Sequence, residues 1–208
     1  MVKDGYRFAA GPLLLGAIGL ALHRYLAGGY GAGGVLIFLG LFVIFFFRDP
    51  ERTPPSDPSA IVSPADGRVM AVVEEARGEN PGRRISVFLS IFDVHVNRSP
   101  VEGRITAISY RPGKFYGAMR ARASAENEQN EFLVSTAQGE VAFKQIAGWV
   151  ARRIVCWKSV GDSVTRGERV GMIRFGSRMD IWLPDRVEIL VRPGQHVAAG
   201  ASILARWK

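Results

Sequence analysis

The sequence predicts a mainly β protein, with a compact β-barrel or sandwich-like domain that contains an internal β repeat and follows an N-terminal hydrophobic helical hairpin. Three observations lead to this fold class. Two long apolar runs come first, short β-branched runs separated by Gly, Pro and Asn follow, and a Gly/Val pattern recurs near the C-terminus. A chain of 208 residues has room for one core with appended elements.

The hairpin is predicted from the apolar segments 8–26 and 30–47, which are separated by a short loop. Each approaches the ~20 residues that a helix needs to cross a bilayer core. Basic side chains flank the pair: Lys3, Arg7, Arg48 and Arg52. The positive-inside tendency then places the N-terminus and the following domain in the cytoplasm, at the cell membrane. Pro12 and several glycines leave a re-entrant or interfacial hairpin open as an alternative.

We divide the chain into a membrane-associated hairpin with the start of a linker, residues 1–52, and a globular domain, residues 53–208. Residues 48–58 are rich in proline and charge and predict a stiff linker. Strands are predicted at 67–73, 84–90, 103–110, 131–136, 140–146, 153–157, 169–173 and 181–184. Long amphipathic helices are not expected in this domain.

An internal repeat occupies the C-terminal part. The spacing of glycine and β-branched residues in 161–170 recurs in 194–203, displaced by 33 residues throughout. We expect two similar β-turn-β units packed against each other. Biotinyl and lipoyl carrier domains share this rhythm, but they need an exposed lysine at a hairpin tip, and this chain has no such segment.

The formal net charge is +8, and residues 53–208 hold 22 of the 27 basic and 16 of the 19 acidic side chains. This balance suits acidic lipid headgroups, with a solvated basic surface as the alternative. Nucleic-acid binding is disfavoured because no basic-aromatic platform motif appears. The single cysteine, Cys156, excludes an intramolecular disulfide and is expected to be a buried core thiol.

The dipeptide Gly176-Ser177 lies between two apolar runs and offers self-cleavage chemistry. The Ser177 hydroxyl can attack the carbonyl of its own preceding peptide bond, because Gly176 has no Cβ to block the approach. Elimination from the resulting ester and hydrolysis of the product would leave a pyruvoyl group. On the dipeptide alone, an ordinary Gly-Ser turn is the simpler interpretation.

His95 lies in a strongly apolar run that polar residues interrupt. Asp93, His95 and Asn97 would share one face of a strand, and imidazole is the usual proton-transfer group near neutral pH. The alternative is a hydrogen-bonded core histidine. His23 is expected at the membrane interface and His196 in an exposed turn. No metal site is predicted, because ligand spacing is absent.

A carboxylate at Asp66, in the segment 63–67, is suited to orient a base or hold a charge in a site. Together with the segments 93–100 and 175–177, and with 46–50 before the domain, this segment resembles the phosphatidylserine decarboxylases in order and spacing. The chain is similar to the short form of that family over about residues 45–190. The resemblance implies a zymogen that cuts itself and decarboxylates phosphatidylserine to phosphatidylethanolamine in phospholipid biosynthesis.

The resemblance also implies roles for single residues. Ser177 would become the covalent pyruvoyl cofactor after cleavage between Gly176 and Ser177. Asp66 matches the family's self-cleavage aspartate, and His95 matches the histidine assigned to decarboxylation. A large chain, 1–176, would pair with a small chain, 177–208. The lipid amine would form a Schiff base with the ketone, loss of CO2 would leave a carbanion, and His95 would protonate it. A homo-oligomer is compatible with this scheme.

Two positions depart from the longer bacterial enzymes. Arg98 stands where they have a second histidine, and Arg178 where they have threonine. Arginine cannot act as a neutral base, so either His95 serves both steps or a water and Asp66 deprotonate Ser177. We predict that Arg98 and Arg178 contact the substrate. Four other basic residues are candidates to receive the lipid phosphate or to form a solvated face: Arg111, Lys114, Arg120 and Arg122.

Three alternatives differ from this assignment. A decarboxylase of another serine-headed lipid, such as the archaeal ether lipid archaetidylserine, would use the same chemistry. A membrane-tethered β-barrel binding module without chemistry would leave the chain uncut. A serine hydrolase is disfavoured, because the Gly-x-Ser-x-Gly elbow is absent from the sequence.

Overall fold

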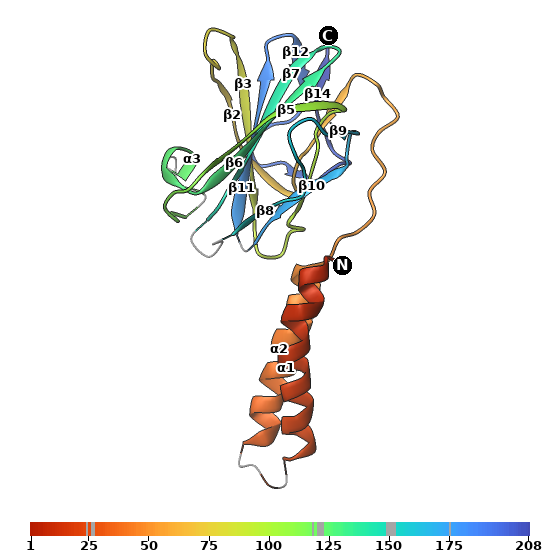
Figure 1. Ribbon diagram of the computed structural model, residues 1–208, viewed down its shortest axis with the longest axis vertical. Helices are drawn as coiled ribbons and strands as arrows, with labels where there is room; N and C mark the ends of the chain where they lie inside the picture. Colours follow the sequence, from red (N-terminus) through yellow and green to blue (C-terminus); the bar gives the residue numbers. More distant parts are fainter. Residues whose placement is uncertain (24, 26–27, 118, 120–122, 149–152, 175) are drawn as a thin grey trace. The chain divides into compact units, whose positions relative to one another are not determined.

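The computed structural model describes residues 1–23, 25, 28–117, 119, 123–148, 153–174 and 176–208, which form two compact units, Met1–Glu51 and Arg52–Lys208. The first unit is a pair of antiparallel helices, α1 (Lys3–Ala21) and α2 (Gly29–Phe46) (Figure 1). They pack through glycines, since a Cβ added at Gly16 would lie 2.9 Å from the Gly33 carbonyl oxygen.

The helical hairpin is confirmed, although its first helix begins and ends earlier than residues 8–26. Within the described residues, α2 alone has the length and hydropathy of a membrane-spanning helix, with a mean hydropathy of 2.1. The shortfall of α1 agrees with the interfacial or re-entrant alternative rather than with two spanning helices. Its polar first turn and its glycines lower its hydropathy.

The second unit is built from strands and one short helix, α3 (Ala123–Glu126). The strands are β1 (Ala60–Val62), β2 (Gly67–Glu74), β3 (Gly82–Leu89), β4 (Val96–Arg98), β5 (Gly103–Arg111), β6 (Gln129–Thr136), β7 (Gly139–Ile146), β8 (Ile154–Cys156), β9 (Ser163–Val164), β10 (Arg169–Ile173), β11 (Ser177–Pro184), β12 (Val187–Ile189), β13 (His196–Val197) and β14 (Ile203–Trp207). The predicted mainly β fold is confirmed.

These strands form three antiparallel sheets. The largest has eight strands in the order β13-β2-β3-β11-β7-β6-β5-β9 and curls into a half-barrel (Figure 1). Two three-stranded sheets, β1-β14-β12 and β4-β10-β8, complete the unit. Strand β11 therefore lies in the middle of the large sheet, paired with β3 on one side and β7 on the other.

Alternation along the strands fills the interior of the half-barrel. Met179, Ile181 and Leu183 on one face of β11 are fully buried, and they belong to the same core as Phe132 and Phe143. These two rings stack with centroids 4.9 Å apart. A position on the inner face of β11 is thus set deep in the domain.

The repeat is visible as two strand-turn-strand units, β9–β10 and β13–β14. Its four glycines all have left-handed backbones: Gly161, Gly167, Gly194 and Gly200, with φ of 96°, 79°, 91° and 72°. The two units meet at their second glycines, where a Cβ added at Gly167 would lie 3.4 Å from the Gly200 carbonyl oxygen. The predicted packing of two similar units is confirmed.

Three local expectations are wrong. Cys156 is exposed at the end of β8, although apolar residues surround it in the sequence. Asp93 lies in a loop and not on a strand with Asn97, since β4 begins only at Val96. The strand predicted at 181–184 begins at Ser177, so this residue opens a strand.

Candidate active site

The junction between Gly176 and Ser177 lies at the start of β11. Ser177 is fully buried, and within the described residues its Oγ has no hydrogen-bond partner. Gly176 has a left-handed backbone with φ of 56°, and among described atoms nothing lies within 4 Å of a Cβ added there. The Ser177 hydroxyl is therefore free of hydrogen bonds to described residues, and Gly176 before it has no side chain to shield its carbonyl group. Phe175, the preceding motif residue, lies outside the described residues.

His95 is brought to this junction from the loop before β4. Its Nε2 lies 3.3 Å from the Gly176 nitrogen and accepts the N–H of that residue. Its Nδ1 lies 2.9 Å from the Asp93 carbonyl oxygen, to which it must donate. The two partners together select the neutral Nδ1–H tautomer. The buried ring thus points the lone pair of Nε2 at the junction.

The loop that holds His95 is fixed by the Asp93 carboxylate. Its Oδ2 accepts hydrogen bonds of 2.7 Å from both the backbone N–H and the hydroxyl of Ser90. Its Oδ1 lies 3.1 Å from Nε2 of His196, which is exposed as expected. The second repeat unit, through β13, therefore supports the loop that positions His95.

Asp66 lies elsewhere in the same unit. Its Oδ1 accepts the Ala199 N–H at 2.7 Å, and its Oδ2 is paired with Arg52 at 2.9 Å. Burial raises the pKa of this carboxyl above its ordinary value, and the Ala199 hydrogen bond and the Arg52 charge oppose that shift only in part.

Strand β3 lies between the backbone next to Asp66 and the Gly176-Ser177 junction. Leu89 of β3 pairs with Ser177 on one side and lies against Gly67 on the other. Two strand spacings, about 10 Å, therefore separate the backbones at 67 and 177. The structure brings His95 to the junction, while the Asp66 carboxyl lies near enough to Asp93 and His196 of the supporting loop for their charges to act on its pKa.

The two departing arginines face different surroundings. Arg98 is buried, donates to the Gly167 carbonyl oxygen at 2.9 Å and lies against Gly200, so it sits where the two repeat turns meet. Arg178 projects from the face of β11 opposite to Ser177 and holds the Asp180 carboxylate through two hydrogen bonds of 2.6 and 2.9 Å.

That ion pair fixes the charge of Asp180. Burial raises the pKa of this carboxyl, but the hydrogen bonds and charge of Arg178 outweigh burial and hold the pKa below its ordinary value. Ser124 adds a further hydrogen bond of 2.7 Å to the same carboxylate. Asp180 is therefore ionised at neutral pH, and its charge is matched locally.

Two of the basic residues proposed for the lipid phosphate have local partners. Lys114 is exposed and paired with Glu126 at 3.0 Å, and Arg111 donates to the Ala125 carbonyl oxygen. Arg120 and Arg122 lie outside the described residues.

His23, in the helical hairpin, stacks on Tyr30 with ring centroids 4.1 Å apart.

Sequence reasoning named Asn97 but missed the two buried amides that join it in a row. Asn130 and Gln145 lie on neighbouring strands of the large sheet, and Gln145 donates to Asn97 at 2.9 Å. All three side chains are at most 2% exposed. The available signal was a polar amide in an otherwise apolar strand, which is costly to bury without a partner.

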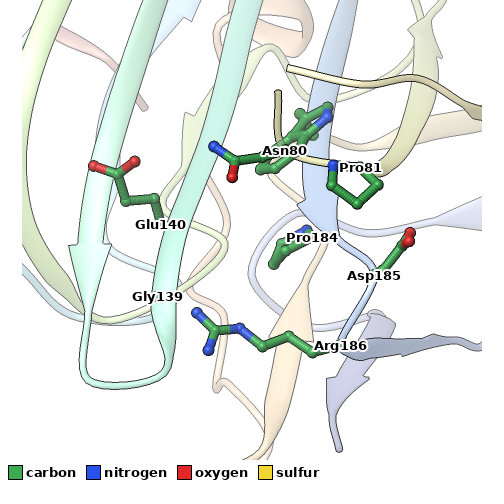
Figure 2. A pocket seen from close by; sticks show the side chains of 8 residues that line it. Asn80, Pro81, Gly139, Glu140, Pro184, Asp185 and Arg186 are labelled. Carbon is green, nitrogen blue, oxygen red and sulfur yellow. The ribbon is translucent and has the colours of Figure 1, made fainter. Parts of the chain in front are cut away.

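A pocket of about 440 Å³ opens at the other end of β11 (Figure 2). It is lined by Asn80, Pro81, Gly139, Glu140, Trp182, Pro184, Asp185 and Arg186. Pro184 is seven residue steps along β11 from Ser177, a distance of about 23 Å, so this pocket is not part of the junction. Within the part of the chain that the structure describes, no cluster of metal ligands occurs.

Comparison with known proteins gives a consistent family. The profile described as Phosphatidylserine decarboxylase matches residues 39–205. A phosphatidylserine decarboxylase proenzyme of Symbiobacterium thermophilum is 44% identical over 99% of this chain and 95% of its own length. Proenzymes of the same name from Trichlorobacter lovleyi and Solibacter usitatus are 48% and 52% identical, over 99% and 82% of this chain and 96% and 81% of their own lengths.

Proposed function

Because this chain belongs to the phosphatidylserine decarboxylase family, we propose that it decarboxylates phosphatidylserine to phosphatidylethanolamine with a pyruvoyl group made from its own Ser177. The relatives are named proenzymes, which supports a precursor that must be cut before it acts. The mature protein would consist of a large chain, 1–176, and a small chain, 177–208.

The observation that carries the proposal is the buried, unpartnered Ser177 Oγ beside the neutral imidazole of His95. In self-cleavage, His95 Nε2 takes the Oγ proton as Oγ bonds to the Gly176 carbonyl carbon, and the peptide C–N bond then breaks. Elimination leaves a carboxylate on Gly176 and a dehydroalanine at position 177. Addition of water and loss of ammonia give the keto group.

The surroundings of residue 177 fit such a group. A small planar ketone needs no more room than the serine it replaces, and the absence of a side chain at Gly176 leaves one side of it open. The keto group, once formed, supplies an electron sink for the pair left when the lipid carboxylate departs. His95 remains at the junction to deliver a proton, and the Asp93 carbonyl oxygen keeps its ring in the same orientation.

The N-terminal helices would hold the enzyme at its substrate. A diacyl lipid stays in the bilayer, and α2 is long and apolar enough to enter it. The basic flanks of the hairpin favour a catalytic domain on the cytoplasmic face. The basic excess of residues 53–208 suits a surface of anionic lipid.

The test is the intact mass of the purified protein and of Ser177→Ala, followed by an assay on phosphatidylserine in detergent micelles. The proposal expects two fragments from the wild type, the smaller one bearing a ketone that reacts with a hydrazine, and a single chain from the variant. Phosphatidylethanolamine should form only with the cut protein. A wild type that stays uncut in lipid and detergent would refute the proposal.

A further inference from the structure

Three buried amides form a directed chain that ends beside the junction. Asn130 Nδ2 donates to Gln145 Oε1 at 3.2 Å, and Gln145 Nε2 donates to Asn97 Oδ1 at 2.9 Å. The oxygen of Asn97 is thereby used as an acceptor, so its nitrogen is the free end of the chain. Within the described residues, Asn97 Nδ2 is buried and has no hydrogen-bond partner.

Room for this chain is made by a glycine. Gly171 of β10 pairs with Asn97 of β4, and a Cβ added at Gly171 would lie 2.3 Å from the Val155 carbonyl oxygen and 3.0 Å from Gln145 Nε2. A side chain there would collide with the backbone of β8 and crowd the Gln145 amide. The contact between two sheets is therefore built around the link from Gln145 to Asn97.

Asn97 and His95 are linked to β11 by separate contacts. His95 Nε2 accepts the N–H of Gly176, and Asn97 Oδ1 accepts from Gln145 of the neighbouring strand β7. Gln145 pairs with Met179, which shares its face of β11 with Ser177. The unused donor and the unused Ser177 Oγ thus belong to one buried region between β4 and β11.

We propose that Asn97 is a catalytic residue of self-cleavage, whose Nδ2–H donates to the Gly176 carbonyl oxygen as that oxygen becomes negative. This role rests on the proposed function above. When Ser177 Oγ bonds to the carbonyl carbon, the C=O electron pair moves onto the oxygen. When the C–N bond breaks, the pair returns and the nitrogen of residue 177 takes the proton. An amide already oriented by Gln145 stabilises the charge without reorganising.

The neighbouring side chains support the choice of Asn97. His95 Nε2 is an acceptor from Gly176 and cannot donate in its neutral tautomer. Arg98, on the opposite face of β4, donates to the Gly167 carbonyl oxygen. Asn97 supplies the donor that the nucleophile and its base lack.

The experiment follows cleavage directly, as conversion of newly synthesised full-length chain to 1–176 and 177–208 in a cell-free translation with detergent. The variants are Asn97→Ala, Asn97→Asp, which keeps the acceptor and removes the donor, and Gln145→Met, which removes the amide that orients Asn97. Asn80→Asp, in the Arg77–Asn80 turn, is the matched amide-to-acid control. Each Asn97 and Gln145 change is also made in a Ser177→Ala chain, where melting reports folding without cleavage.

We expect both Asn97 variants to cleave about 100- to 1,000-fold more slowly than the wild type, the usual cost of losing one such donor. Gln145→Met should slow cleavage less, and Asn80→Asp should cleave at the wild-type rate. Folded Asn97 variants that cleave within about threefold of the wild type would overturn this role alone. An uncut wild type would overturn the proposed function, and this role with it.

Discussion

The replacement His95→Gln separates the proton-transfer role of this side chain from its place in the structure. The Gln side-chain oxygen can still accept the Gly176 N–H, which Nε2 now accepts at 3.3 Å, but an amide cannot take up or deliver a proton. A single neutral hydrogen bond contributes about 0.5–1.5 kcal/mol, so the unfolding free energy should fall by no more than this. The chemistry should lose the whole proton transfer, about 10²- to 10⁴-fold in rate.

Two rates are measured for this variant. The cleavage rate is followed by gel, and decarboxylation is followed by phosphatidylethanolamine formed per keto group, titrated with a hydrazine. Slowing of both rates means that His95 acts in both steps. Slowing of decarboxylation alone assigns the cleavage base to a water and Asp66. His23→Gln, in the other unit, should match the wild type. Decarboxylation by His95→Gln within about threefold of the wild type per keto group would refute the assignment of His95.

Three further changes test the surroundings of the junction. Gly176→Ala should lower the unfolding free energy by about 1–2 kcal/mol, because the left-handed backbone disfavours a Cβ that meets no described atom, and gel analysis should show slower cleavage. A loss above about 4 kcal/mol would contradict these open surroundings. Asp180→Asn should cost about 3–5 kcal/mol at pH 7, because it leaves Arg178 buried without its carboxylate. The pKa of Asp180 is lowered in the folded protein, so the stability that this carboxylate contributes is lost as the pH falls through that pKa. Denaturation at several acid pH values should therefore show a fall in stability for the wild type that is absent from the variant. Arg52→Met should raise the pKa of Asp66 further, because it removes a positive charge beside the carboxylate. If cleavage needs ionised Asp66, the acid limb of the pH–rate profile for cleavage should move to higher pH. An acid limb at the wild-type pH would show that ionised Asp66 is not needed.

Local pattern was enough to predict most of the architecture. Several strands of the large sheet, such as β2 and β3, coincide with apolar runs that follow a glycine, and the repeated glycines mark turns whose left-handed backbone favours that residue. The Gly176-Ser177 junction and His95 were identified from residue chemistry, and the structure brings the two together.

The features that the sequence did not predict depend on contacts between residues far apart in the chain. Cys156 has apolar neighbours in the sequence, but its exposure depends on what packs over β8 in the folded chain. The row formed by Asn130, Gln145 and Asn97 joins strands of two sheets, so no local spacing reveals it. The backbones at Gly67 and Ser177 lie on opposite sides of β3 for the same reason.

The two turns of the internal repeat contact residues near the candidate site. The first turn supplies the Gly167 carbonyl oxygen that binds Arg98, and the second supplies the Ala199 N–H that binds Asp66. Arg98 stands where the longer enzymes have a second histidine. Its guanidinium has five N–H donors, which suit a place where two glycine turns meet and present carbonyl oxygens. Arg98 can therefore fix the relative position of the turns that hold Asp66 and, through His196, the Asp93 loop. We therefore propose that the proton chemistry falls to His95, whose Nε2 lies 3.3 Å from the Gly176 nitrogen.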